Sequence, residues 1–271
     1  MKRLLKPLRV FFALIVFLCV NAAFLMPAVS AAFCLEDAPD FTWAARIQFL
    51  PALLGLNLVV VFAILAVTML VGRVYCSVLC PLGVLQDIAI RLRRWVRKDR
   101  FATDRMHSGW RWTLAGVAAL VFGLGMVDPY GIFGRGVTHL VRPVVQGILN
   151  LAADWSDAHE KYWLMREDVV LPAAGALVLS ALTLVIVLVL AAWKGRWFCQ
   201  RLCPVGACLS LAAKRPLVKL RIDATRCVSC GLCAKGCKAG AIDAQGKVVD
   251  NARCVRCFDC LGTCKKGAIK L

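Results

Sequence analysis

Long apolar runs alternate with polar, mostly basic segments along the 271 residues of the chain. A hydrocarbon layer about 30 Å thick is crossed by a helix of about 20 apolar residues. Uncharged runs of at least that length occupy residues 10–35, 47–72 and 169–193, and a shorter one, rich in Gly and Ala, occupies residues 112–127. The pattern predicts an α-helical membrane protein with four transmembrane helices.

Lys and Arg are distributed unevenly among the segments that connect these runs. Basic residues precede the first run and follow the second and fourth, whereas the connection after the first run is acidic and the one after the third is mixed. Cytoplasmic loops carry the excess of basic residues, so we expect a multi-pass protein of a bacterial inner (cytoplasmic) membrane with both termini in the cytoplasm. A cleaved signal peptide is the alternative for the first run, because of its basic start and the small-residue sequence AVSAA.

Composition agrees with a membrane location. The chain is 61% hydrophobic with a mean hydropathy of +0.73, whereas soluble domains are about 45–50% apolar. The net charge of +18 does not indicate nucleic acid, because the basic residues flank apolar runs and no groove-reading motif accompanies them. We expect membrane lipid as a partner, with residues 82–96 forming an amphipathic helix on the cytoplasmic surface.

A short motif is repeated after the second and fourth apolar runs. Gly-Arg-x-aromatic-Cys-x3-Cys-Pro-x-Gly occurs at residues 72–83 and again at residues 195–206, with every shared position 123 residues apart. The repeat divides the membrane domain, residues 1–216, into two pseudo-repeated pairs of helices. Cysteines at i and i+4 share one face of a helix, and the proline after them is expected to end that helix.

Three interpretations of these motif thiols stay open. Together they suffice for a third metal or iron–sulfur site; alternatively each pair is a redox-active or partner-contacting dithiol, or consists of small side chains packed where helices meet. The four residues are Cys76, Cys80, Cys199 and Cys203. The motif arginines, Arg73 and Arg196, are expected to anchor the helix ends among lipid headgroups.

Near residue 217 the apolar runs stop and eight cysteines form two tetrads. Both follow Cys-x2-Cys-x2-Cys-x3-Cys, 27 residues apart, which is the spacing of bacterial two-cluster ferredoxins, where the fourth cysteine of each run binds the other cluster. Zinc also binds four thiolates, but two complete tetrads at this spacing favour iron. Residues 217–271 are thus predicted to form a small cytoplasmic α+β ferredoxin domain with two [4Fe–4S] clusters, held by Cys227, Cys230, Cys233 and Cys264 and by Cys254, Cys257, Cys260 and Cys237.

Two further features of this tail bear on its structure and electrostatics. Residues 241–250 read as a short hairpin that turns at Gln245 and Gly246. Lys238 and Lys265 stand where such cysteine runs normally continue with proline, and a cation beside a ligating sulfur is expected to raise the cluster potential. The basic tail suits either an acidic redox partner or the anionic inner leaflet.

The apolar runs, the paired motifs and the two-cluster tail together resemble the NapH/MauN-type membrane ferredoxins, which are related to the core of NosR-type regulators. The resemblance covers nearly the whole chain and rests on Cys76, Cys80, Pro81, Cys199, Cys203 and Pro204 together with the eight tail cysteines. It implies a quinol dehydrogenase component that passes electrons between the quinone pool and another redox protein, such as a ferredoxin-type subunit, a cytochrome or a reductase. Whether the chain itself is an enzyme stays open.

A quinol site requires hydrogen-bonding groups and a proton acceptor. An expected outer loop, residues 128–139, offers Asp128, Tyr130, Arg135 and His139, although its first residues also make an ordinary turn. An inner alternative contains Tyr75, Gln86, Asp87 and Arg73. Two other functions compete with electron transfer from quinol: an assembly factor that supplies electrons to a maturing metalloenzyme, and a redox sensor, for which the sequence shows no output domain.

Overall fold

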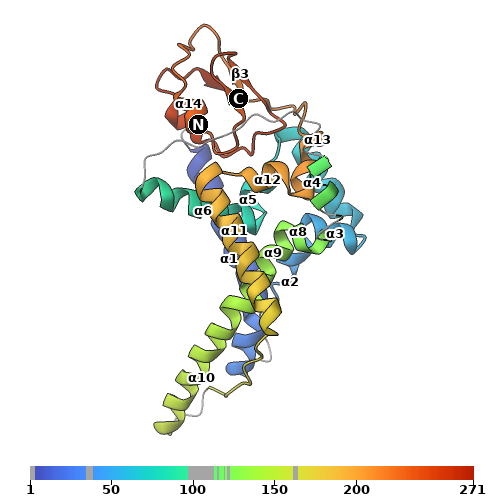
Figure 1. Ribbon diagram of the computed structural model, residues 1–271, viewed down its shortest axis with the longest axis vertical. Helices are drawn as coiled ribbons and strands as arrows, with labels where there is room; N and C mark the ends of the chain where they lie inside the picture. Colours follow the sequence, from blue (N-terminus) through green and yellow to red (C-terminus); the bar gives the residue numbers. More distant parts are fainter. Residues whose placement is uncertain are drawn as a thin grey trace.

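The computed structural model describes residues 4–34, 39–96, 113, 114, 116–118, 120, 123–160 and 164–271. The molecule is elongated, with the cysteine-rich C-terminal domain at one end of its long axis (Figure 1). The start of α1 and the C-terminus both lie at that end. The chain is mostly helical, and the strands lie in the C-terminal domain.

The helices before the cysteine-rich domain form two groups in chain order. The first group is α1 (Leu5–Ala32), α2 (Thr42–Arg46), α3 (Phe49–Leu54), α4 (Leu58–Val71), α5 (Tyr75–Val78) and α6 (Pro81–Val96). The second is α8 (Leu124–Val127), α9 (Pro129–Gly136), the π-helical η1 (Val137–Val141), α10 (Arg142–Ala158), α11 (Ala174–Lys194), α12 (Trp197–Arg201) and α13 (Pro204–Ala212). Helix α6 packs against α11 and α9, and α1 packs against α10 and α5.

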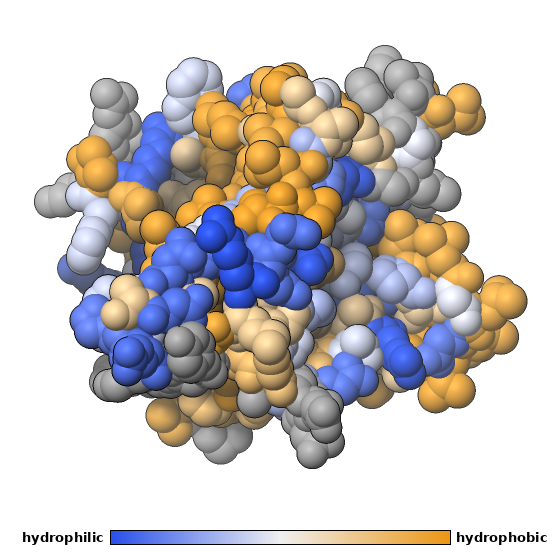
Figure 2. All heavy atoms as spheres, turned by 90° about the horizontal axis from the view of Figure 1, so that it is seen from below, coloured by the Kyte–Doolittle hydropathy of each residue, from blue (hydrophilic) through white to orange (hydrophobic). Residues whose placement is uncertain are grey.

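Two of the described helices, α1 and α11, are long and apolar enough to cross a membrane. They contain 28 and 21 residues, or about 42 and 32 Å at 1.5 Å per residue. Most of their side chains are not buried by the rest of the protein: only 11% and 17% of their most apolar stretches are. Seen from the end opposite the C-terminal domain, apolar side chains flank a central polar band (Figure 2).

The predicted second and third spans differ from the structure. Residues 47–72 do not form one helix, because the chain turns after α3, with Leu56 at φ 53° and Asn57 capping α4 through a bond from the amide of Val60. Helix α4 has 14 residues, or about 21 Å. Part of the third run, including residues 112, 115, 119, 121 and 122, lies outside the described residues. Four transmembrane helices therefore remain a prediction.

Each repeated motif forms a helix, a break and a second helix. Pro81 and Pro204 are the first residues of α6 and α13. Proline is tolerated at this position because the N–H that it lacks would have no partner within the helix. The preceding thiols accept the amide hydrogens of the glycines three residues later, at 3.4 Å from Gly83 N to Cys80 Sγ and at 3.2 Å from Gly206 N to Cys203 Sγ. The proline thus starts a new helix rather than simply ending one, and the second thiol of each motif sits at the break.

The C-terminal domain contains two small antiparallel sheets and two short helices. Strand β1 (Arg221–Ile222) pairs with β4 (Ile269–Lys270), and β2 (Ile242–Asp243) pairs with β3 (Val248–Val249), while α14 (Leu232–Lys235) and α15 (Asp259–Thr263) follow the cysteine loops. The predicted hairpin is confirmed by the β2–β3 pairing. A small core of Leu220, Ile242, Val249 and Ile269 holds the sheets together.

The C-terminal domain docks on the glycines that open the two motifs. Gly72 has φ +95°, and a side chain there would meet the Arg256 guanidinium, 2.7 Å from its Nε; Gly195 has φ +68° and lies against the Lys238 carbonyl oxygen. The amide of Arg196 donates to that carbonyl at 2.8 Å. Both motifs therefore need glycine for its left-handed backbone and for the close approach of the neighbouring domain.

We expect Gly195→Ala to loosen this docking. A non-glycine residue at positive φ costs about 1–2 kcal/mol, and the added methyl group must also displace the Lys238 carbonyl. Limited proteolysis of the full chain should cut the connection at residues 213–220 faster in this variant. Gly175→Ala is the matched control, because nothing lies within 4 Å of a side chain placed there. Equal cleavage of the two variants would contradict the docking role.

Candidate iron–sulfur and thiol sites

The eight tail cysteines line two separate cavities of the C-terminal domain. One cavity is bordered by Cys227, Cys230, Cys233 and Cys264, and the other by Cys237, Cys254, Cys257 and Cys260. Each cavity thus takes three cysteines from one run and the fourth from the other, which is the crossed grouping expected from the spacing. Four thiols per cavity are a suitable donor set for a [4Fe–4S] cluster.

The loops around these cavities repeat the same unusual backbone. Ser229 and Gly231 have positive φ in the first loop, and Arg256 and Phe258, each 27 residues later, have positive φ in the second. Left-handed residues bend the chain tightly and are costly outside glycine. Their recurrence on both sides of the middle cysteine shows that the loops curl in the same way, so that each run directs three cysteines at one cavity.

The structure brings the four motif thiols together. Each is 3–5% exposed, and all belong to one buried cluster of side chains. They are close enough to interact electrostatically: Cys203 with the other three, Cys80 with Cys76 and Cys199, and Cys199 with Cys76. All cysteines of the chain are free thiols. Residues about 120 positions apart in sequence thus lie in one buried cluster, which we name the four-thiol site (Cys76, Cys80, Cys199 and Cys203). No three His, Cys, Asp or Glu side chains of the described residues converge closely enough to hold a single metal ion.

The motif arginines cross between the two copies. Arg73 donates to the carbonyl oxygen of Cys199 at 3.3 Å, and Arg196 donates to the carbonyl oxygen of Cys76. Both are 0% exposed, so their expected role as lipid anchors is wrong. A guanidinium can satisfy several backbone carbonyls at once because its donors form a rigid fork, and the exchange joins the two motifs around the four-thiol site.

Other hydrogen bonds tie the four-thiol site to the C-terminal domain. Arg73 also donates to the Oε1 of Gln200 at 3.1 Å and to the carbonyl of Ala252 at 3.3 Å, and Gln200 Nε2 donates to the carbonyl of Arg253 at 2.7 Å. Among the described residues, Arg73 makes no contact with a carboxylate. Cys257 of the second tail tetrad, 8% exposed, lies in the same buried cluster as the four-thiol site.

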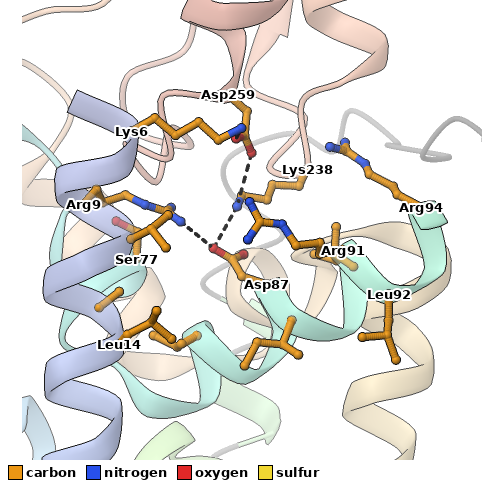
Figure 3. Close-up of a pocket in the computed structure, with 15 residues that line it drawn as sticks. Lys6, Arg9, Leu14, Ser77, Asp87, Arg91, Leu92, Arg94, Lys238 and Asp259 are labelled. Atoms are coloured by element: carbon orange, nitrogen blue, oxygen red, sulfur yellow. Dashed lines mark hydrogen bonds and ion pairs between the residues drawn. The ribbon is translucent and has the colours of Figure 1, made fainter. Parts of the chain in front are cut away.

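Asp87 on α6 is the centre of a charge network at this junction (Figure 3). Its carboxylate pairs with Arg196 at 2.8 Å, Lys238 at 2.8 Å and Arg9 at 3.3 Å. Lys238 also pairs with Asp259 at 3.4 Å. Burial alone would raise the pKa of Asp87, but the positive charges of Arg196, Lys238 and Arg9 lower it below its usual value. Lys238 follows Cys237, where such cysteine runs normally continue with proline. By pairing with Asp87 of α6, it joins the C-terminal domain to the helices before it.

The comparisons with known proteins agree with this architecture. A family model described as a 4Fe-4S binding domain matches residues 53–99 and 174–223, which contain the two motifs, and a second model with the same description matches residues 220–243. The methylamine utilization ferredoxin-type protein MauN of Methylorubrum extorquens is 29% identical over 69% of this chain and 53% of its own length. MauN of Paracoccus denitrificans is 28% identical, with 69% and 54% covered.

The regulatory protein NosR of Pseudomonas aeruginosa is 28% identical over 66% of this chain and 22% of its own length. These similarities support a MauN/NosR-type family of 4Fe–4S ferredoxin proteins for this chain. It spans about half the length of the MauN relatives and about a fifth of NosR. No solved structure matches it.

The quinol-site residues expected in an outer loop belong to helices of this ferredoxin-type protein. The segment is helical, and Asp128 caps α9 by accepting the amide hydrogen of Gly131 at 2.7 Å. Asp128 is 3% exposed, its Oδ1 has no partner among the described residues, and it interacts electrostatically with Tyr75, Tyr130 and Arg135. The segment is therefore helical rather than a loop, and it packs into the core beside the first motif, whereas its outer position stays a prediction.

His139 is separated from this group. It lies 11 residues after Asp128, or about three helical turns, and its Nδ1 is 2.7 Å from the Ser180 hydroxyl of α11. The inner alternative is also divided in the structure. Tyr75 bonds to Gln48 Oε1 at 2.9 Å, Gln86 Oε1 accepts from the Cys199 thiol at 3.1 Å, and Asp87 is fully engaged in its charge network.

Burial raises the pKa of Asp128 to about 6, against the opposing effects of the Gly131 and Tyr130 amides and the Arg135 charge. Of the residues in the two quinol-site hypotheses, Asp128 is thus the buried carboxyl that can exchange a proton near neutral pH. Sequence reasoning missed Gln48 and Gln200 altogether. Gln48 lies inside an apolar run, and Gln200 occupies a motif position that differs between the two copies, so only their uncharged polar side chains could have drawn attention to them.

Lys238→Met tests the junction between the domains of this ferredoxin-type protein. The change removes a buried cation from Asp87 and Asp259, and we expect the thermal midpoint of the cluster-loaded protein to fall by roughly 5–10 °C. Unfolding is followed by loss of visible absorbance. Lys265→Met, at the equivalent position of the second tetrad, is exposed and is the matched control. Similar midpoints for the two variants would show that Lys238 does not hold the domains together.

Proposed function

We propose that this protein is a membrane-anchored electron-transfer protein that passes electrons between the quinol pool and a partner redox protein. The observation that carries the proposal is the position of the four-thiol site, which shares one buried cluster with Cys257 of the second tail tetrad. The first tail tetrad lies beyond it and includes the exposed Cys230. Three groups of thiols thus lead from the apolar frame to the surface of the C-terminal domain.

Membrane anchoring is supported by the apolar surfaces that the fold leaves uncovered. On α1 and α11 these include Phe11, Leu18, Val178 and Leu182, which are 54–65% exposed. Large contiguous apolar surfaces are rare on soluble monomers. The C-terminal domain and the basic start of α1 lie at one end of the molecule (Figure 1), which suits a frame with that end in the cytoplasm.

The tail cysteines are suited to hold two [4Fe–4S] clusters, one in each cavity, and such clusters supply one-electron transfer when bound. The chain contributes a covered second cavity and a first cavity nearer the surface, bordered by Val228, Leu232 and Lys265. The basic residues around the first cavity suit a partner with an acidic surface. Electron exchange with a soluble or membrane-bound partner would therefore take place at this end of the domain.

Buried charge supports a third metal or iron–sulfur site at the four-thiol site. The junction contains five cations that are at most 9% exposed and two carboxylates that are less than 20% exposed. The cations are Arg9, Arg73, Arg196, Lys238 and Arg256; the carboxylates are Asp87 and Asp259. Uncompensated buried charge is costly, whereas thiolates that bind a metal would balance the excess. A packing role for uncharged thiols leaves that excess unexplained.

A quinol is proposed to donate electrons near Tyr75 and Asp128. Tyr75 lines an apolar cavity of about 330 Å³ between α4 and residues 74–79, with Ile64, Val67 and Leu79 among its walls. Tyr75 directly precedes Cys76 of the four-thiol site, and Asp128 interacts electrostatically with its hydroxyl. The chain thus places a hydrogen-bonding hydroxyl, a buried proton acceptor and the four thiols around one region of the core.

Metal counting tests the third site. With four irons in each of three clusters, anaerobically purified protein should contain about twelve irons. The double change Cys80→Ser and Cys203→Ser should lower the content to about eight, because the tail tetrads stay intact. Cys208→Ser is the control, since Cys208 lies in α13 outside the three tetrads. About eight irons in the unchanged protein, or zinc in place of iron, would overturn the third cluster.

Quinol oxidation is tested by mixing oxidised protein in lipid nanodiscs with a quinol analogue and following the loss of visible absorbance. The rate should rise as pH increases through about 6, because Asp128 accepts a proton only when ionised. Asp128→Asn should slow the reaction by roughly 100-fold and flatten its pH dependence. Asp154→Asn, whose side chain is 51% exposed, is the control. Iron-loaded protein that no quinol reduces would favour an assembly role instead.

A further inference from the structure

A basic cavity of about 210 Å³ lies where α1, α6 and the C-terminal domain meet (Figure 3). Its lining contains five basic side chains, Lys6, Arg9, Arg91, Arg94 and Lys238, and two carboxylates, Asp87 and Asp259. The carboxylates already pair with Lys6, Arg9, Arg196 and Lys238. The cavity therefore keeps an excess of positive charge after its internal ion pairs are counted.

Arg9 directs unused hydrogen-bond donors into this region. Its side chain is 9% exposed and bonds to Asp87 only through Nη2, at 3.3 Å. Its Nε and Nη1 are buried and have no partner in the part of the chain that the structure describes. A buried guanidinium with two unsatisfied donors is costly, so the site is complete only with an added acceptor.

Arg91 supplies a second cation without a partner. It extends from α6 toward Lys238 (Figure 3), and among the described residues it forms no hydrogen bond or ion pair. Arg94, one turn further along α6, donates to the carbonyl of Gly236 at 2.8 Å. Cations from α1, α6 and the C-terminal domain thus converge on one space, an arrangement suited to an oxyanion with several acceptor oxygens.

The opposite wall of the cavity is apolar. Val10, Ala13 and Leu14 of α1 face Val84, Ile88 and Leu92 of α6. Leu14, Ile88 and Leu92 are 46%, 39% and 62% exposed, so this wall continues onto the apolar outer surface of both helices. A ligand that combines a phosphate with hydrocarbon chains matches both parts, and basic residues at the cytoplasmic end of a membrane helix attract such anionic headgroups.

We propose that this cavity binds the phosphate of an anionic phospholipid, with its acyl chains along α1 and α6. The inference rests on the membrane anchoring proposed above, but not on the clusters or on quinol. Because Arg9 and Lys238 also hold Asp87, the bound phosphate would neutralise cations at the junction between the frame and the C-terminal domain. The lipid would thereby stabilise the docked arrangement of the two domains.

Native mass spectrometry of the delipidated, cluster-loaded full chain tests this inference. Phosphatidylglycerol should bind with defined stoichiometry, phosphatidylcholine should bind at least about tenfold more weakly, and inorganic phosphate should not compete at millimolar concentration. Arg91→Gln and Arg9→Gln should each weaken phosphatidylglycerol binding about tenfold, since each removes a charge-assisted hydrogen bond to the phosphate. Arg91 is exposed, so its variant is expected to fold normally.

Lys214→Gln is the matched control, because Lys214 is exposed and does not line the cavity. Equal losses in this control and in Arg91→Gln would overturn the site and indicate general attraction to charge. Competition by inorganic phosphate would keep a phosphate site but overturn the lipid as its source. Iron content is measured on the anaerobically purified protein from which these samples are prepared: a protein that purifies without iron but binds the lipid would contradict the proposed function while supporting this inference.

Discussion

The exchange of arginines between the two motif copies is the interaction on which the rest of the structure depends. Arg73 reaches the Cys199 carbonyl and Arg196 reaches the Cys76 carbonyl, so each copy fixes the backbone that carries the first thiol of the other. Both guanidinium groups are fully buried, and burial of a cation is tolerated only with a dense set of acceptors. The exchange explains why the motif pairs Gly-Arg with the cysteines: together with the Cys199–Gln86 hydrogen bond, it holds four thiols from distant segments in one region.

Docking of the C-terminal domain follows from the same residues. The glycine before each arginine lets that domain approach, at Arg256 on one side and at the Lys238 carbonyl on the other. Arg73 and Gln200 then bond to the successive carbonyls of Ala252 and Arg253, which directly precede the second cysteine run. The contact is made by backbone and buried charge rather than by a flexible linker, so the second tail tetrad is held in a defined position against the four-thiol site.

Much of this architecture is predictable from the sequence. The cysteine spacing predicts the grouping of cysteines around the two cavities, and the turn residues Gln245 and Gly246 predict the hairpin, because both patterns determine local loops. The apolar pattern predicts α1 and α11 but misjudges residues 47–72, where Leu56 and Asn57 turn the chain despite continuous apolarity. It also assigns Arg73 and Arg196 to lipid. Hydropathy cannot distinguish an arginine at the membrane surface from one buried between two repeats, since that depends on tertiary contacts with a segment more than 100 residues away.

The differences between the two copies are as informative as their identities. Glycine, arginine, both cysteines and proline are shared, and these residues build the four-thiol site. Tyr75, Gln86 and Asp87 of the first copy correspond, 123 residues later, to Phe198, Leu209 and Ser210. The first copy therefore carries the hydroxyl, amide and carboxylate, while the second presents mostly apolar groups at the same places. Because Asp128 and Arg9 approach from the side of the first copy, proton-exchanging and charged groups collect on one side of a nearly symmetric frame. The shared residues suffice for the four-thiol site, whereas the proposed exchange with a quinol would use the groups that only the first copy carries.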